Sequence, residues 1–116
     1  MSHTTITAGL VAPAVVTLAD AASIAVNAGL GNDFRVKLGA SRSVANPAGG
    51  VDGQRITLMI TQPAAGSATV TWGSQYKFGA AGAPRLSTAG SSTDVIGFIY
   101  NQSLGSWLCV GAALGF

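Results

Sequence analysis

Apolar and polar residues alternate along much of the chain. Apolar side chains in residues 34–38 (FRVKL) are separated by two basic residues, and those in residues 55–62 (RITLMITQ) occupy every second position. A period of two places successive side chains on opposite faces of an extended strand. The pattern therefore predicts two strands, each with one face toward a core.

Three further segments extend this prediction. Residues 68–72 (ATVTW) are rich in the β-branched and aromatic side chains that favour strands. Residues 93–101 (TDVIGFIYN) are apolar on both faces, so we expect this strand to lie inside a sheet. The last segment, residues 106–116 (SWLCVGAALGF), follows a short turn of Asn, Ser and Gly, which predicts an antiparallel hairpin.

The N-terminal part of the pattern is more ambiguous. Residues 15–29 are rich in alanine, but a helix there would have only about two turns and would be marginal without packing. Because Ile24, Val26 and Ala28 alternate with polar or small residues, we predict a strand, a turn and a strand. Glycine-rich turns separate the strands at roughly 8 to 12 residues, which is typical of an antiparallel sandwich or barrel. A chain of 116 residues fits one such all-β domain.

Charge is scarce in this chain. Only 9% of residues are charged, against roughly 25% in an average soluble domain. Buried subunit interfaces are depleted of charge, so a permanent assembly explains the composition. The net charge of +2 is scattered, which argues against a nucleic-acid partner. We find neither a signal peptide nor an apolar stretch long enough for a membrane span, so we expect synthesis in the cytoplasm and no membrane partner.

Residues suited to catalysis or metal binding are few. The chain has no Glu, one His (His3) and one Cys (Cys109), which we expect to be a buried apolar side chain. Its four aspartates lie next to predicted turns, where Asp commonly bonds to its own backbone. They are Asp20, Asp33, Asp52 and Asp94. We therefore predict that the protein is not an enzyme and has no catalytic, cofactor-binding or metal-binding residues.

An aromatic cluster within residues 68–90 is the strongest candidate for a contact site. Trp72, Tyr76 and Phe78 lie close together in the sequence, and Lys77 and Arg85 are the only charged residues nearby. Such aromatic side chains either pack in a core or subunit contact, which we favour, or stack against sugar rings. In the first case the two basic residues are candidates for pairing with a partner's carboxylates.

The order of these segments resembles a β-rich module of tailed-bacteriophage virion proteins. The module occurs at the ends of tail fibres and in small capsid decoration (cement) proteins, and the resemblance covers about residues 31–112. It is carried by a basic strand, an Asn-Pro turn, a Gly-Gln strand, a V-T-W strand, a Pro-x-Leu-Ser turn, an Asp-Val-Ile strand and a terminal Trp strand. The matching positions are Phe34, Asn46, Pro47, Gly53, Gln54, Gln62, Trp72, Phe78, Pro84, Leu86, Asp94 and Trp107.

The resemblance implies an antiparallel sandwich of jelly-roll type that assembles as a homotrimer. It brings no catalytic or cofactor residues with it. We favour a capsid decoration protein on the capsid surface, which would bind the major capsid protein and stabilise the assembled head. The alternative is a tail-fibre or tail-tip module that recognises a host surface glycan.

The capsid hypothesis gives a role to the N-terminal segment. We predict that residues 1–22 form an extended arm and that residues 23–116 form the sandwich. The sequence TTIT has the β propensity to add a strand to a neighbouring sheet. Its residues Thr4, Thr5, Ile6 and Thr7 are the candidate arm contacts.

Overall fold

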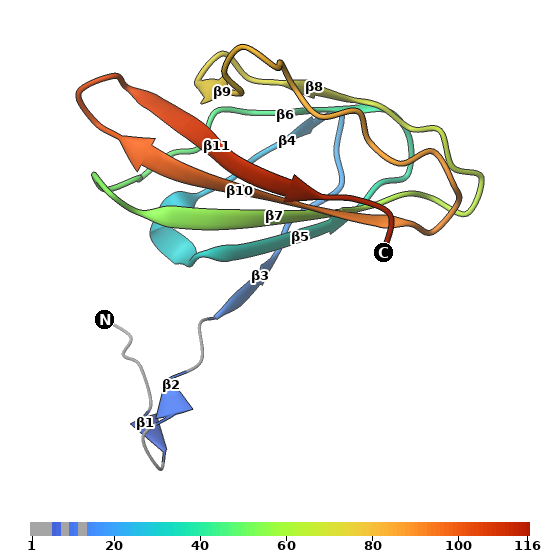
Figure 1. Ribbon diagram of the computed structural model, residues 1–116. Coiled ribbons are helices and arrows are strands. Elements are labelled where there is room, and N and C mark those ends of the chain that lie inside the picture. Colours follow the sequence, from blue (N-terminus) through green and yellow to red (C-terminus); the bar gives the residue numbers. More distant parts are fainter. Residues whose placement is uncertain (1–5, 8–9, 12–13) are drawn as a thin grey trace.

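The computed structural model describes residues 6–7, 10–11 and 14–116, and it is an all-β structure with one short 3₁₀ helix, η1 (Ala28–Leu30) (Figure 1). The strands are β1 (Ile6–Thr7), β2 (Leu10–Val11), β3 (Val15–Thr17), β4 (Ser23–Ile24), β5 (Asp33–Lys37), β6 (Arg42–Val44), β7 (Arg55–Thr61), β8 (Val70–Trp72), β9 (Tyr76–Lys77), β10 (Thr93–Asn101) and β11 (Ser106–Ala113). The all-β prediction is confirmed.

Two sheets enclose one core. The large sheet has the order β3-β5-β7-β10-β11-β9 and the small sheet the order β4-β6-β8, while β1 and β2 pair with each other. Figure 1 shows the small sheet covering one face of the large sheet. Ile24 and Val44 of the small sheet are buried in the same cluster as Phe34, Leu58 and Phe98 of the large sheet. A single core of this kind is what the alternating pattern predicts.

The chain winds between the two sheets from β3 to β9. Each odd-numbered strand of this stretch lies in the large sheet and each even-numbered strand in the small one. Because the chain returns to a sheet after one full turn, neighbouring strands run in the same direction. The pairs β3–β5, β5–β7, β4–β6 and β6–β8 are accordingly parallel, as is β9–β11.

These parallel pairs differ from the expected antiparallel sandwich of jelly-roll type, which is built from antiparallel strands. Alternation tells which side chains share a face, but it carries no information on strand direction. Within the large sheet, antiparallel pairing occurs on both sides of β10, which pairs with β11 in the predicted hairpin. β10 also pairs antiparallel with β7 and so lies inside the sheet, as its two apolar faces predict.

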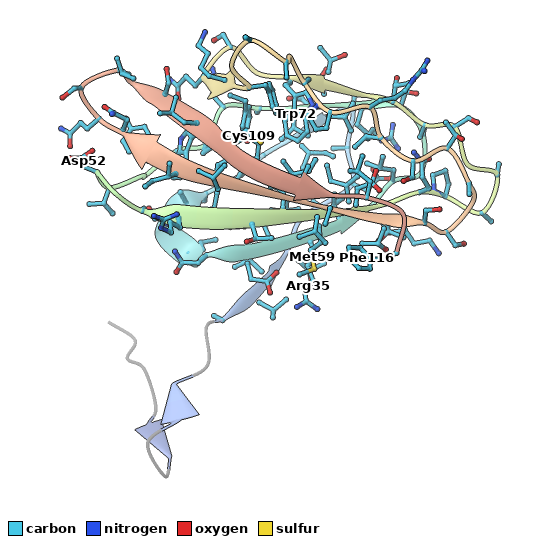
Figure 2. All side chains as sticks on the ribbon, viewed as in Figure 1. Arg35, Asp52, Met59, Trp72, Cys109 and Phe116 are labelled. Carbon is cyan, nitrogen blue, oxygen red and sulfur yellow. The ribbon has the colours of Figure 1, made fainter. Side chains whose placement is uncertain are left out.

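A β-bulge shapes the hairpin of β10 and β11. The register shifts between Gly97 and Phe98, so that Gly97 pairs with Gly111 and Phe98 with Cys109, and Val110 is the extra residue. A Cβ atom added at Gly97 would lie 3.5 Å from Cγ2 of Val110. Val110 therefore lies over Gly97 on the outer face of the large sheet, the face away from the small sheet. Figure 2 shows Met59 and Arg35 on this same face.

Several short elements were not predicted. β6 and β9 have three and two residues, too few for a visible alternation. The helix η1 begins after Asn27, whose side-chain oxygen accepts a hydrogen bond from the amide of Gly29. Such a cap satisfies an N–H that otherwise lacks a partner.

The segment predicted as an arm contains paired strands. β3 pairs with β5 at the edge of the large sheet. Ile6 and Thr7 form β1 and pair with β2. The other two candidate arm contacts, Thr4 and Thr5, lie outside the described residues.

Candidate functional site

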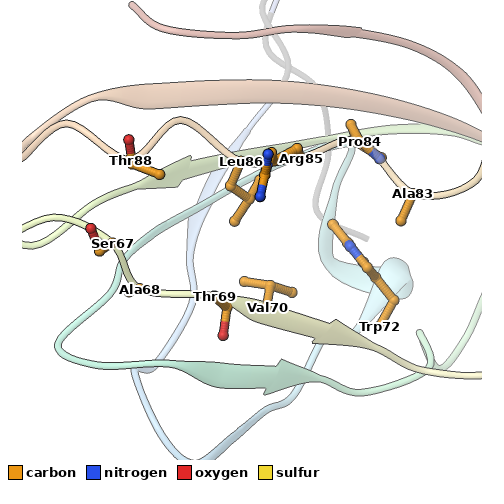
Figure 3. Close-up of a pocket in the computed structure, with 10 residues that line it drawn as sticks. All are labelled: Ser67, Ala68, Thr69, Val70, Trp72, Ala83, Pro84, Arg85, Leu86 and Thr88. Carbon is orange, nitrogen blue, oxygen red and sulfur yellow. The ribbon is translucent and has the colours of Figure 1, made fainter.

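A groove of about 280 Å³ lies between β8 and the loop before β10 (Figure 3). One wall is formed by β8 and the residues that lead into it, and the other by residues 83–88. The lining residues are Ser67, Ala68, Thr69, Val70, Trp72, Ala83, Pro84, Arg85, Leu86 and Thr88. The groove thus combines apolar side chains with hydroxyl groups and one cation.

Gln62, directly after β7, ties the two walls together. Its side chain is buried, and its Oε1 accepts a hydrogen bond from the amide of Ala68 at 2.9 Å. Its Nε2 donates to the carbonyl oxygens of Ala68 at 2.8 Å and Ser87 at 2.9 Å. One amide group therefore sets the separation between the start of the β8 wall and the end of the loop wall.

Asp94, in β10, fixes the loop wall from the other side. This carboxylate is buried and accepts hydrogen bonds from the amide and hydroxyl of Ser87, both at 2.7 Å, and from the amide of Gly115 at 2.9 Å. Bonds from several donors compensate a carboxylate for its removal from water. Asp94 is therefore more than a turn-forming aspartate, since it joins segments distant from it in the sequence.

The alternating pattern of the sequence indicates that both Gln62 and Asp94 are buried. Gln62 continues the buried phase of β7, after Ile56, Leu58 and Ile60, and Asp94 opens the buried phase of β10. A polar residue in phase with a buried apolar series must find hydrogen-bond partners. We define these two residues as the polar clamp.

Trp72 lines the groove and packs against three further aromatic rings. The Trp72 ring lies 5.1 Å from that of Tyr76, 5.3 Å from Phe78 and 5.7 Å from Phe98, measured between ring centroids. These edge-to-face and tilted contacts are favourable for aromatic pairs. Trp72 is only partly buried and lines the groove, so its position is fixed while part of its surface remains accessible.

Tyr76 belongs to the core. Only 4% of its surface is exposed, and its hydroxyl donates to the carbonyl oxygen of Ala45 at 2.9 Å. Burial raises the pKa of Tyr76, which further favours the protonated phenol that donates this hydrogen bond. Of the predicted aromatic contacts, only Trp72 lines the groove; Phe78 packs half-buried against the core.

The two predicted cations occupy different surroundings. Arg85 lines the groove, whereas Lys77 is exposed on β9 and does not line it. In the described chain, ion pairs join Arg35 to Asp33 and Arg42 to Asp20, and the hydrogen bond from Arg42 lowers the pKa of Asp20. Neither Lys77 nor Arg85 is among these pairs.

The main chain of β8 also contributes to the groove. β8 is an edge strand, bonded to β6 alone among the described strands. The Arg42 amide donates to the carbonyl of Thr69, and the Gly73 amide donates to the carbonyl of Val44. Because main-chain groups of successive residues point to opposite edges of a strand, those of Val70 and Trp72 point away from β6. They are available at the groove edge.

Other chemistry is sparse in the described ranges. Within them, no group of three or more His, Cys, Asp or Glu side chains is placed to hold a metal ion. No helix there is long and apolar enough to cross a membrane. Cys109, predicted to be buried, is half-buried against the core.

Replacing Gln62 by Leu tests the polar clamp. The change leaves the buried amide and carbonyl of Ala68 without partners, and each unsatisfied group costs about 1–3 kcal/mol. For the two groups together, we expect the free energy of unfolding, measured with urea, to fall by at least about 2 kcal/mol. Gln102→Leu is the control, since Gln102 is exposed in the hairpin loop. Equal stability of the two variants would contradict a role for the clamp.

Comparisons with known proteins address the identity of the fold. No curated protein and no solved structure matches the chain. A protein family described as "Putative phage tail fibre C-terminal domain" matches residues 25–103. This match spans most of the chain, from the residue after β4 to the turn between β10 and β11, and includes the polar clamp and the groove. The chain therefore belongs to this phage tail fibre C-terminal domain family and is a structural module of a phage virion.

Proposed function

We propose that this chain forms the end of a phage tail fibre and contacts the host cell surface. The observation that carries the proposal is the family match over residues 25–103. The match favours a fibre module over the capsid decoration protein that we first preferred, because the family is described by its place in the tail fibre. A fibre end is the part of a virion that meets the cell first.

The groove supports a role in binding. Ligand sites are commonly concave and apolar with a few polar groups that orient the ligand. The groove has this character: Trp72 lines one end, the hydroxyls of Ser67 and Thr88 line the other, and Leu86 lies between them. An aromatic ring and hydroxyl groups in one groove suit a sugar, which has both apolar ring faces and polar edges. A host surface glycan is thus the ligand class that we propose.

The outer face of the large sheet supports assembly into a homotrimer. On this face β5 and β7 carry Arg35 and Arg55 beside Met59, whereas β10 and β11 present Ile99 and Val110 and no charged side chain. The β10–β11 part of the face thus lacks charge, as interface cores do. We propose that this part packs against two further copies of the chain, as in a fibre built from three parallel chains.

Immunogold labelling of intact virions tests the proposed location. Antibodies against the purified chain are expected to label the ends of the tail fibres, because the family is a fibre C-terminal domain. Antibodies against the major capsid protein provide the reference for head labelling. Gold confined to the head would contradict the proposal and support a capsid decoration protein instead.

Substitution of Val110 tests the proposed trimer. A buried unpaired charge is costly, so Val110→Asp should convert trimers to monomers. Size-exclusion chromatography with light scattering measures the mass of each variant. Val51→Asp is the matched control, because Val51 is 65% exposed, close to the 58% of Val110, but lies in the turn before β7. A trimer that survives Val110→Asp, or a wild-type monomer, would exclude this interface.

A further inference from the structure

We propose that the groove between β8 and residues 83–88 binds a sugar that carries a carboxylate, such as a uronic or sialic acid. Trp72 would stack against the sugar ring and Arg85 would pair with its carboxylate. The inference rests on the proposed function and deepens it, because it names the class of glycan and the residues that recognise it.

Charge is the first argument. The four aspartates are all engaged elsewhere in the structure: two in ion pairs, Asp94 within the polar clamp and Asp52 with the amide of Gln102. Arg85 therefore faces the groove without an acidic partner in the described part of the chain. The planar guanidinium matches the two oxygens of a carboxylate and binds them with paired hydrogen bonds.

The second argument is the placement of Trp72. Its contacts with Tyr76, Phe78 and Phe98 hold the indole in position before any ligand arrives. A binding surface that is already ordered loses little conformational entropy on association. Figure 3 shows Trp72 on the β8 wall and Arg85 on the opposing loop wall, so that one ligand between the walls can contact both residues.

The remaining polar groups suit sugar hydroxyls. The main-chain groups of Val70 and Trp72 point toward the free edge of β8, and Thr88 contributes a hydroxyl from the other wall. The volume of about 280 Å³ lies just below the range for drug-sized ligand pockets, roughly 300–1,000 Å³. We infer that the groove accepts one terminal sugar unit rather than an extended chain.

The stiffness of the walls supports a selective site. Gln62 and Asp94 both bond to Ser87, two residues after Arg85. Gln62 also bonds to Ala68, two residues before Val70. The polar clamp thus holds the cation and the edge strand at a set distance, which favours a ligand of one size.

Titration with simple saccharides tests the inference. The full chain is titrated with glucuronic acid, sialic acid, glucose and a sugar phosphate, and binding is followed by calorimetry. We expect the two carboxylate sugars to bind about tenfold more tightly than glucose, the effect of one charge-assisted contact. Tighter binding of the sugar phosphate than of both carboxylate sugars, or no binding of any probe, would overturn the inference.

Two matched variants assign the preference to Arg85. Arg85→Gln should bring glucuronic acid down to the affinity of glucose, while Lys77→Gln should leave both affinities unchanged, because Lys77 is exposed outside the groove. Melting temperatures check that both variants are folded. Unchanged sugar affinity in Arg85→Gln would overturn the inference, and dissociation of its trimers would identify Arg85 as a subunit contact instead.

The outcomes for location and for ligand are separable. Fibre-end labelling without saccharide binding would refute only the groove as a site for acidic sugars. Labelling confined to the head would refute the fibre proposal itself, whatever the titration shows.

Discussion

The polar clamp of Gln62 and Asp94 is the constraint on which the rest of this structure depends. Both side chains lie in an otherwise apolar interior, where polar groups are costly unless they are hydrogen-bonded. Their partners are main-chain atoms of Ala68, Ser87 and Gly115 and the hydroxyl of Ser87. Satisfying the clamp therefore also fixes three segments that are not part of a strand at these residues. The walls of the groove are therefore a consequence of how the core is completed.

The sequence predicted the faces of the strands better than their directions. Alternation identified the strands β5, β7 and β10, because each buries side chains at every second position. β11 has no such alternation of burial and was predicted from the turn that precedes it. It could not show that the chain crosses to the small sheet between successive strands of the large one, which makes neighbours parallel. Short strands such as β6 contribute too few side chains to reveal a period.

The candidate site was predicted in composition but not in arrangement. The sequence identified Trp72, Tyr76 and Arg85 as candidate contact residues, yet their spacing alone does not show which aromatic side chain is buried in the core. That choice depends on tertiary packing: Tyr76 reaches the carbonyl of Ala45 and is buried, which leaves Trp72 beside the groove. Gln62 was noted as one position of the phage-module resemblance, but its role required the positions of Ala68 and Ser87.

A fibre end that meets a cell surface needs a rigid scaffold and a preformed contact site, and we propose that the core and the groove supply these. The adsorption rate of phage that carry Arg85→Gln in this chain, with Lys77→Gln phage as the control, tests the central claim most directly. The account predicts that Arg85→Gln virions assemble normally but adsorb at least about tenfold more slowly than the control. Equal adsorption rates for the two variants would contradict it.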